Sequence, residues 1–278
     1  MLQPYLIGEL EGWSQSRGTT ARLREVPFPG VPLIFNLGAP WQIVHAVEDG
    51  RRDRHDSFVA GLHTAPSFVR GENGSWACIE LRLTPLGARR LLGRPMHELT
   101  NRTLELPELL PQSHELLERL RELDAWADRF ALVEAFLARR FAESGTLAPG
   151  VEWSWRWLYR SKGRAPITAI ATELGWSHRR LIARFRDHLG LTPKQFARIV
   201  RFDRAVQSLH RTPRPSLAGV AHDCGYCDQA HMNRDFRELA GTTPAALVAA
   251  RKRHRQPRRV ALCLAASISS KTDRPSEA

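Results

Sequence analysis

The C-terminal half of the chain contains an internal repeat, and this repeat constrains the fold more than any other feature. The segment AIATELGWSHRRLIARFRDHLGLTP begins at Ala169, and a related segment, GVAHDCGYCDQAHMNRDFRELAGTTP, begins at Gly219. The matching pairs are Ala171 and Ala221, Gly175 and Gly225, Phe185 and Phe236, Gly190 and Gly241, and Pro193 and Pro244. The offset is 50 in the first two pairs and 51 in the others, so one residue is inserted between them. A fixed period of this kind indicates one supersecondary unit that is used twice.

Each copy has the pattern of a short helix, a tight turn and a second helix. Ala171 is small enough to let a neighbouring helix approach closely, and Gly175 suits a turn with positive φ. Ser177 in the first copy and Asp228 in the second are residue types that cap the N-terminus of a helix. Two packed helices joined in this way form a helix-turn-helix. A single pattern of this kind is common in helical hairpins, but two in register predict a double helix-turn-helix domain.

The second helix of each unit has a core face and an outward face. Leu181 and Phe185 lie four positions apart on one side, and Met232 and Phe236 match them. Helical periodicity places on the opposite side Arg179, Ile182, Ala183 and Arg186 of the first helix, and Gln229, Ala230, Asn233, Arg234 and Arg237 of the second. Arg, Asn and Gln make paired hydrogen bonds to guanine and adenine edges, and Ile and Ala can contact a thymine methyl group. Any one of these residues alone would be an ordinary solvated side chain, but together they predict two base-reading helices.

A long amphipathic helix is predicted between the two units, in LTPKQFARIVRFDRAVQSLHR. Its apolar stripe consists of Phe196, Ile199, Phe202, Ala205, Val206 and Leu209. A rigid helix would hold the reading helices at a fixed separation, and a separation of about 34 Å would place them in successive major grooves. Phosphate contacts position a protein without specifying sequence, and the residues suited to them are His178, Arg180, Lys194 and Arg201.

The charge is unevenly divided along the chain. Residues 1–150 carry 17 Lys and Arg against 19 Asp and Glu, whereas residues 151–278 carry 24 against 10. The whole net charge of +12 therefore lies in the C-terminal part. Such a surplus attracts phosphate backbones, and the basic stretch RKRHRQPRR near the end is expected to add non-specific affinity in a disordered tail of residues 253–278. No apolar run reaches the length of a membrane span, and the start of the chain lacks the pattern of a signal peptide. A cytoplasmic, nucleoid-associated protein is expected, with no membrane partner.

The N-terminal part is predicted to be β-rich. Ala77 to Leu83 alternates apolar and polar residues, VPLIFNLG and WQIVHAV are similar short runs, and Asp49-Gly50 is a hairpin-turn dipeptide. From TPLGARRLLG onward the periodicity becomes helical. The predicted fold class is α+β: a small β-barrel or sandwich over residues 1–107, a helical hairpin and linker over 108–150, and the all-α domain over 151–252. The hairpin suits either dimerisation or packing against its own barrel.

The stretch CGYCDQAHMNRDF offers a second interpretation, because Cys224, Cys227 and His231 have spacings seen in zinc and redox sites. The repeat argues against it: Cys224 aligns with the core residue Leu174, and the first unit has no cysteine. A structural zinc site needs four ligands, and only His222 is near as a fourth. A DNA-binding thiol or metal sensor stays as the alternative function. No metal and no cofactor are expected.

The C-terminal part resembles the AraC/XylS family of bacterial transcription regulators. The resemblance covers about residues 151–252 and rests on GWSHRRLIARFRDHLGLTP and, more closely, on GYCDQAHMNRDFRELAGTTP. It implies base reading by Arg179, Ile182 and Ala183 in the first unit and by Gln229, Ala230 and Arg234 in the second. Ile182 and Ala183 are less polar than is usual in the family, so reading by the first unit would depend mainly on Arg179.

The N-terminal part resembles the sensor portion of some members, through SFVAGLHT and TPLGARRLLGRPMHELTNR. This implies a cupin-like barrel that binds a small-molecule effector and often dimerises. A cupin metal site usually needs an HxH pair, whereas His45, His55 and His63 are isolated in the sequence.

A sequence-specific transcription regulator is therefore the leading hypothesis, and the chain is not expected to be an enzyme. Its expected partners are double-stranded DNA, RNA polymerase, a small-molecule effector and a second copy of the chain. Two other classes of protein fit parts of the sequence. One is a cupin-type metalloenzyme or DNA-repair alkyltransferase, which no HxH pair or separate reactive-cysteine motif supports. The other is a basic packaging protein, which would show no preferred DNA site.

Overall fold

The computed structural model describes residues 11–15, 23–45, 52–71, 76–212 and 215–253. The predicted Asp49-Gly50 turn and the tail beyond residue 253 lie outside these ranges. Two antiparallel sheets form the N-terminal domain. In spatial order, the first contains β1 (Glu11–Gln15), β8 (Trp76–Leu83), β3 (Val31–Asn36), β6 (Phe58–Ala60) and β9 (Thr103–Glu105). The second contains β2 (Leu23–Glu25), β7 (Ser67–Gly71), β4 (Trp41–His45) and β5 (Arg52–His55).

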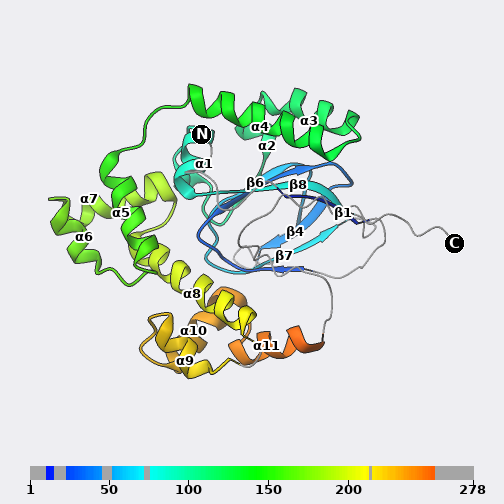
Figure 1. Ribbon diagram of the computed structural model, residues 1–278. Helices are drawn as coiled ribbons and strands as arrows, with labels where there is room; N and C mark the ends of the chain where they lie inside the picture. Colours follow the sequence, from blue (N-terminus) through cyan, green and yellow to red (C-terminus); the bar gives the residue numbers. More distant parts are fainter. Residues whose placement is uncertain (1–10, 16–22, 46–51, 72–75, 213–214, 254–278) are drawn as a thin grey trace.

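Apart from β9, the described chain after β8 consists of helices and the segments that join them (Figure 1). The N-terminal domain continues with α1 (Pro85–Leu92), the 3-10 helix η3 (Met96–Glu98) and α2 (Leu106–Leu109). The hairpin is α3 (Ser113–Glu122) and α4 (Trp126–Glu143), and the C-terminal domain begins with α5 (Pro149–Arg160). Its remaining helices are α6 (Ile167–Glu173), α7 (His178–Leu189), α8 (Pro193–Arg211), α9 (Leu217–Asp223), α10 (Gln229–Ala240) and α11 (Pro244–Arg253). The predicted α+β class is confirmed, and α5 begins slightly before residue 151.

The strand predictions hold because the apolar periodicity matches the buried faces. Five apolar residues of β3 and β8 are 0% exposed and belong to one core cluster: Leu33, Phe35, Ile79, Leu81 and Leu83. The hairpin packs on its own domain at β1, where a Cβ added to Gly12 would lie 2.5 Å from the Trp126 ring. Only a glycine permits that close approach of helix and strand.

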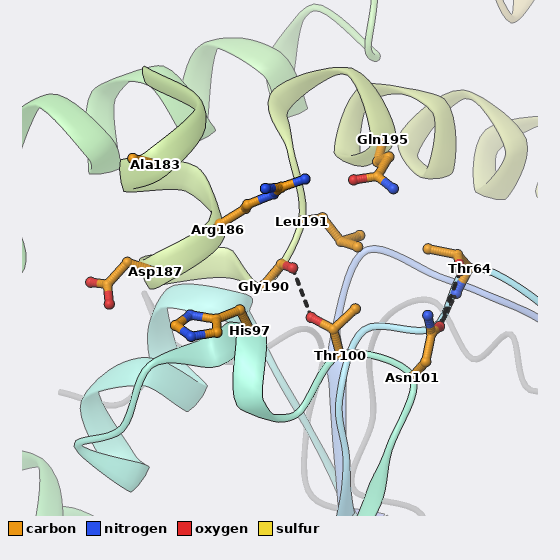
Figure 2. A pocket seen from close by; sticks show the side chains of 10 residues that line it. All are labelled: Thr64, His97, Thr100, Asn101, Ala183, Arg186, Asp187, Gly190, Leu191 and Gln195. Atoms are coloured by element: carbon orange, nitrogen blue, oxygen red, sulfur yellow. Dashed lines mark hydrogen bonds between the residues drawn. The ribbon is translucent and has the colours of Figure 1, made fainter. Parts of the chain in front are cut away.

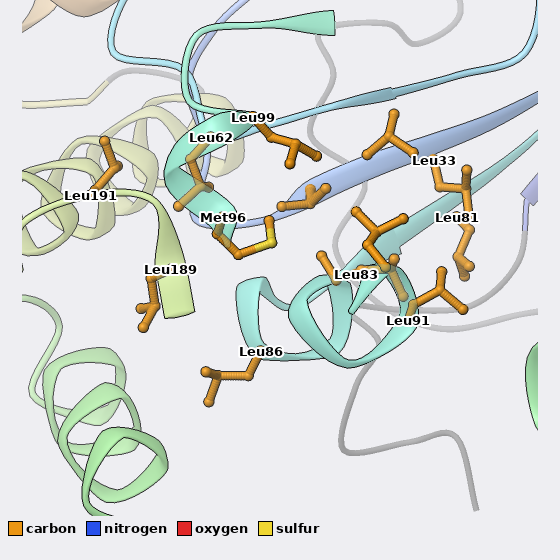
Figure 3. Close-up of a cluster of buried hydrophobic side chains, with 14 of the residues drawn as sticks. Leu33, Leu62, Leu81, Leu83, Leu86, Leu91, Met96, Leu99, Leu189 and Leu191 are labelled. Carbon is orange, nitrogen blue, oxygen red and sulfur yellow. The ribbon is translucent and has the colours of Figure 1, made fainter. Parts of the chain in front are cut away.

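The main hydrophobic core runs without interruption from the N-terminal sheets into the first half of the C-terminal domain. Figure 3 shows Leu189 and Leu191, at the end of α7 and just after it, beside Met96 and Leu62 of the N-terminal domain. A separate core holds the second half of the C-terminal domain together, and it includes Val26 from the N-terminal domain. Both halves of the C-terminal domain therefore pack against the N-terminal domain.

Candidate DNA interface

The first helix-turn-helix unit consists of α6, a turn at Gly175 and α7. Gly175 has a φ of 60°, which is the left-handed conformation that a glycine adopts without strain. The Trp176 N–H donates to the carbonyl of Ala171 at 2.9 Å and closes the end of α6. The Ser177 hydroxyl accepts a hydrogen bond from the Arg180 N–H at 3.2 Å and caps α7. The predicted turn and cap are both confirmed.

The second unit repeats these contacts with one extra residue in the turn. Gly225 has a φ of 80°, and the Tyr226 N–H donates to the carbonyl of Ala221 at 2.9 Å. The Asp228 carboxylate accepts from the His231 N–H at 2.6 Å and caps α10. The inserted residue lies between the glycine and the capping residue, outside both helices of the unit.

The core faces of both second helices are buried as predicted. Leu181, Phe185, Met232 and Phe236 are each 0% exposed, and the Phe236 ring packs edge-on against Phe202 of α8 at 4.9 Å. The helical period then turns the opposite faces outward. Exposed residues on these faces are Arg179, Ile182, Ala183, Arg186, Gln229, Ala230, Arg234 and Arg237, and Asn233 is half-buried. Base reading by these residues stays a prediction.

Three of the four residues assigned to phosphate contacts are exposed: His178, Arg180 and Lys194. The fourth, Arg201, is half-buried and donates to the Gly163 carbonyl at 2.9 Å, so part of its guanidinium has a structural role. Lys194 and Arg201 both line a groove between the two units. The same groove contains Arg164, which sequence reasoning missed.

Arg164, in the segment between α5 and α6, contacts the second unit directly. Its Nη2 donates to the carbonyls of His222 and Asp223, at the C-terminal end of α9. Unpaired carbonyls at a helix end attract a positive charge. No sequence pattern marks Arg164, because its partner lies far along the chain. Its placement adds positive charge to the groove between the units.

A second arginine fixes α10 on the long helix. Arg198 of α8 donates to the Asp235 carboxylate at 2.7 Å and also to Glu238. Asp235 is 4% exposed, so its charge needs this partner. The buried stripe predicted for the long helix is confirmed, since Phe196, Ile199, Phe202, Ala205, Val206 and Leu209 are all buried.

The cysteine cluster is not assembled as a ligand set. Cys224 is 5% exposed in the core of the second unit, and burial raises the pKa of its thiol. Cys227 is exposed in the turn, and His231 packs edge-on against Tyr226 at 5.2 Å. Among the residues that the structure describes, no group of three or more His, Cys, Asp or Glu could hold a metal ion. The thiol or metal sensor hypothesis is therefore not favoured.

A cavity lies inside the N-terminal sandwich. Its walls are mainly apolar, and they include Ile34, Trp41 and Phe58. The polar lining includes Arg82, which donates to Glu80 at 2.9 Å, and His63. Burial, with a smaller contribution from His45, lowers the pKa of His63 to about 3, so the ring is neutral near pH 7.

Two histidines that are isolated in the sequence meet beside this cavity. The rings of His45 and His63 are stacked with their centroids 5.1 Å apart. His45 and His63 are distant in the sequence and form no HxH motif, so the sequence gives no sign of this contact. The reason is that β4 and the segment after β6 come from different parts of the chain.

No helix in the described ranges is long and apolar enough to cross a membrane.

Comparisons with known proteins agree with the presence of two helix-turn-helix units in the C-terminal domain. A family profile described as a helix-turn-helix domain matches residues 170–250, and a domain of unknown function (DUF6597) matches residues 4–105. The HTH-type transcriptional activator RhaS of Escherichia fergusonii is 27% identical over 198 residues. That match covers 67% of this chain and 62% of RhaS, which is less than two thirds of the relative.

Two solved structures match this chain at low sequence identity. ToxT from Vibrio cholerae has a TM-score of 0.49 at 8% identity, covering 87% of this chain and 97% of ToxT. The C-terminal domain of AraT, a response regulator from Geobacillus stearothermophilus, has a TM-score of 0.36 at 21% identity, covering 38% of this chain and 89% of that domain. The doubled unit on one long helix, the helix-turn-helix profile and the similarity to RhaS all support the resemblance of the C-terminal part to the AraC/XylS family of transcription regulators.

Proposed function

We propose that this protein is a sequence-specific DNA-binding transcription regulator. The observation that carries the proposal is the matched pair of outward faces on α7 and α10, which a single long helix joins. Each face presents arginines, and α10 adds Gln229 and Asn233, which are residue types that bind base edges. The surplus of basic residues in this half of the chain supplies general affinity for phosphate. RNA polymerase and a second copy of the chain are proposed as further partners.

Arg234→Ala should weaken binding to the preferred DNA site by about 1–3 kcal/mol and relax the preference at one base pair. Arg234 is exposed on the outward face of α10, so its removal leaves the core of the second unit intact. The preferred site is first selected by the full chain from random DNA. Titration of that site and of a scrambled duplex then gives both affinities.

The control for Arg234 is Lys194→Ala, because Lys194 is exposed beside the groove between the units and is assigned to phosphate. This variant should weaken all sequences alike and reduce the slope of log affinity against log salt by about one unit. Equal losses for Arg234→Ala on the selected and scrambled duplexes would contradict base reading. Failure to select any site would instead favour a packaging protein.

We further propose that the cavity in the sandwich binds the effector. Its apolar walls, with a neutral His63 and the Arg82–Glu80 pair, suit a molecule with an apolar body and a small polar group. His63→Phe keeps the ring volume but removes both ring nitrogens. We expect a compound that raises the melting temperature of the wild type to lose this effect in His63→Phe. An unchanged response would place the compound elsewhere.

A further inference from the structure

The second helix of the first unit, α7, packs against the N-terminal domain, which is called the sensor domain below. The Thr100 hydroxyl donates to the carbonyl of Gly190, directly after α7, at 2.7 Å. Arg89 of α1 lies 3.6 Å from Asp187 of α7. Leu189 is 0% exposed, and Leu191 beside it is 2% exposed, within the core that also contains Met96. Apolar contact of this kind opposes separation of the two domains.

This packing covers the core-facing side and the C-terminal end of α7, but it leaves the outward face of the helix exposed. Arg179, Ile182 and Arg186 stay exposed. Figure 2 shows the groove that results, with Ala183, Arg186 and Gln195 from the C-terminal domain facing His97, Thr100 and Asn101 from the sensor domain. A duplex that Arg186 contacts would therefore lie next to the sensor domain.

The sensor side of this groove has groups that suit phosphate oxygens. His97 is exposed on η3. Asn101 has a φ of 60°, and its Oδ1 accepts hydrogen bonds from the Thr64 N–H at 2.7 Å and the Thr64 hydroxyl at 3.1 Å. The side-chain amide of Asn101 is thereby fixed with its oxygen occupied, which leaves the NH2 group as a donor. The Asn101 NH2 group and a ring N–H of His97 are both hydrogen-bond donors, and Asn is among the residue types that contact DNA backbones.

The acidic residue of the groove does not oppose such a contact. Asp187 lies beside Arg89 at 3.6 Å and the His188 ring at 3.6 Å, so a guanidinium faces its charge. Arg94 and Arg102 are exposed in the same turn of the sensor domain, where Arg94 is paired with Glu98 and Arg102 donates to the Glu98 carbonyl. The surroundings of His97 are therefore positive on balance.

We infer that η3 and residues 99–101 of the sensor domain form part of the DNA interface. They contact the phosphate backbone along the edge of the DNA major groove into which α7 inserts. This inference rests on the proposed function, because it requires α7 to lie against DNA. It assigns to the sensor domain a direct contact with double-stranded DNA, in addition to effector binding.

The test uses the full chain with His97 changed to an acid or a base. His97→Glu should weaken binding to the selected duplex about fivefold through repulsion of the backbone, and His97→Lys should tighten binding by a similar factor. His97→Lys should also make the salt dependence steeper by about one unit. His114→Glu is the matched control, because His114 is exposed on α3, which lies away from α7 in Figure 1.

Wild-type affinity and salt dependence in both His97 variants would overturn the inference and would indicate that the sensor domain stays clear of DNA. Loss of affinity in His114→Glu as large as in His97→Glu would also overturn it, since the effect would then be one of overall charge. The result for Arg234→Ala separates the two proposals. If that variant loses site preference while the His97 variants bind normally, base reading by α10 is supported. Only the proposed contact between the sensor domain and the DNA backbone is then rejected.

Discussion

Gly190→Ala is expected to lower the free energy of unfolding by about 2–4 kcal/mol, combining left-handed backbone strain of about 1–2 kcal/mol with a steric clash. Gly190 ends α7 with a φ of 90°. A Cβ at this position would lie 2.7 Å from the Thr100 hydroxyl and 2.9 Å from the Met96 carbonyl oxygen, both in the sensor domain. The backbone oxygen cannot rotate away, so relief requires the two domains to move apart.

The repeat supplies a matched control in Gly241, which ends α10 with a φ of 60°. The nearest atom to a Cβ there is Cγ of Pro66, at 3.6 Å, which is ordinary contact. Gly241→Ala should therefore show only the backbone strain, about 1–2 kcal/mol. Denaturant unfolding of both variants, followed by tryptophan fluorescence and circular dichroism, measures the difference. Equal losses would show that Gly190 does not hold the domains together.

The Gly190 variant also bears on the sensor contact with DNA. If the domains separate in Gly190→Ala, His97 no longer lies beside the duplex. His97→Glu should then have little effect on DNA affinity in that background. A full effect of His97→Glu in the double variant would show that the domain contact is not needed to present His97.

Asp203→Asn is expected to stabilise the protein at pH 8 by roughly 2–4 kcal/mol, since each unit of pKa shift corresponds to about 1.4 kcal/mol. Asp203 is 7% exposed on α8, and burial raises the pKa of its carboxyl group from 3.8 to about 7. Arg204, Arg82 of the sensor domain and a hydrogen bond from Gln207 act in the opposite direction but do not overcome burial. The amide has no charge to bury and can still accept from Gln207, which donates to Asp203 at 2.6 Å.

The pH dependence has a definite sign. Well below the unfolded pKa of 3.8 the carboxyl group is protonated in both states, and the folded protein carries no penalty. Between pH 4 and 7 the unfolded chain releases the proton while the folded protein retains it, so stability falls as pH rises and then levels off above 7. Asp203→Asn should remove this slope from a series of melting curves. Asp124→Asn, at an exposed residue between α3 and α4, should leave it unchanged. A slope that persists in Asp203→Asn would assign it to another group.

The sequence predicted the helix-turn-helix units well because the signals for them are local. The glycine turns, the capping residues Ser177 and Asp228, and the buried pairs at i and i+4 all lie within one unit, and the repeat shows each of them twice. The same repeat predicts that Cys224 belongs to the core, and Cys224 is buried there. The contacts of Arg164 with α9, the stacked His45 and His63, and the partial burial of Arg201 had no such signal, because their partners are distant in sequence.

The sequence by itself determined which residues of α7 and α10 face outward, because the helical period and the apolar pairs leave one orientation that buries Leu181, Phe185, Met232 and Phe236. Only the tertiary structure decided what lies beside those faces. Leu189 and Gly190 have the local pattern of an ordinary helix end, and nothing in their neighbourhood in the sequence indicates Met96 or Thr100 as partners. The closeness of the sensor domain to α7 follows from burial of apolar surface across the two domains, which depends on the shapes of both and not on the periodicity of either.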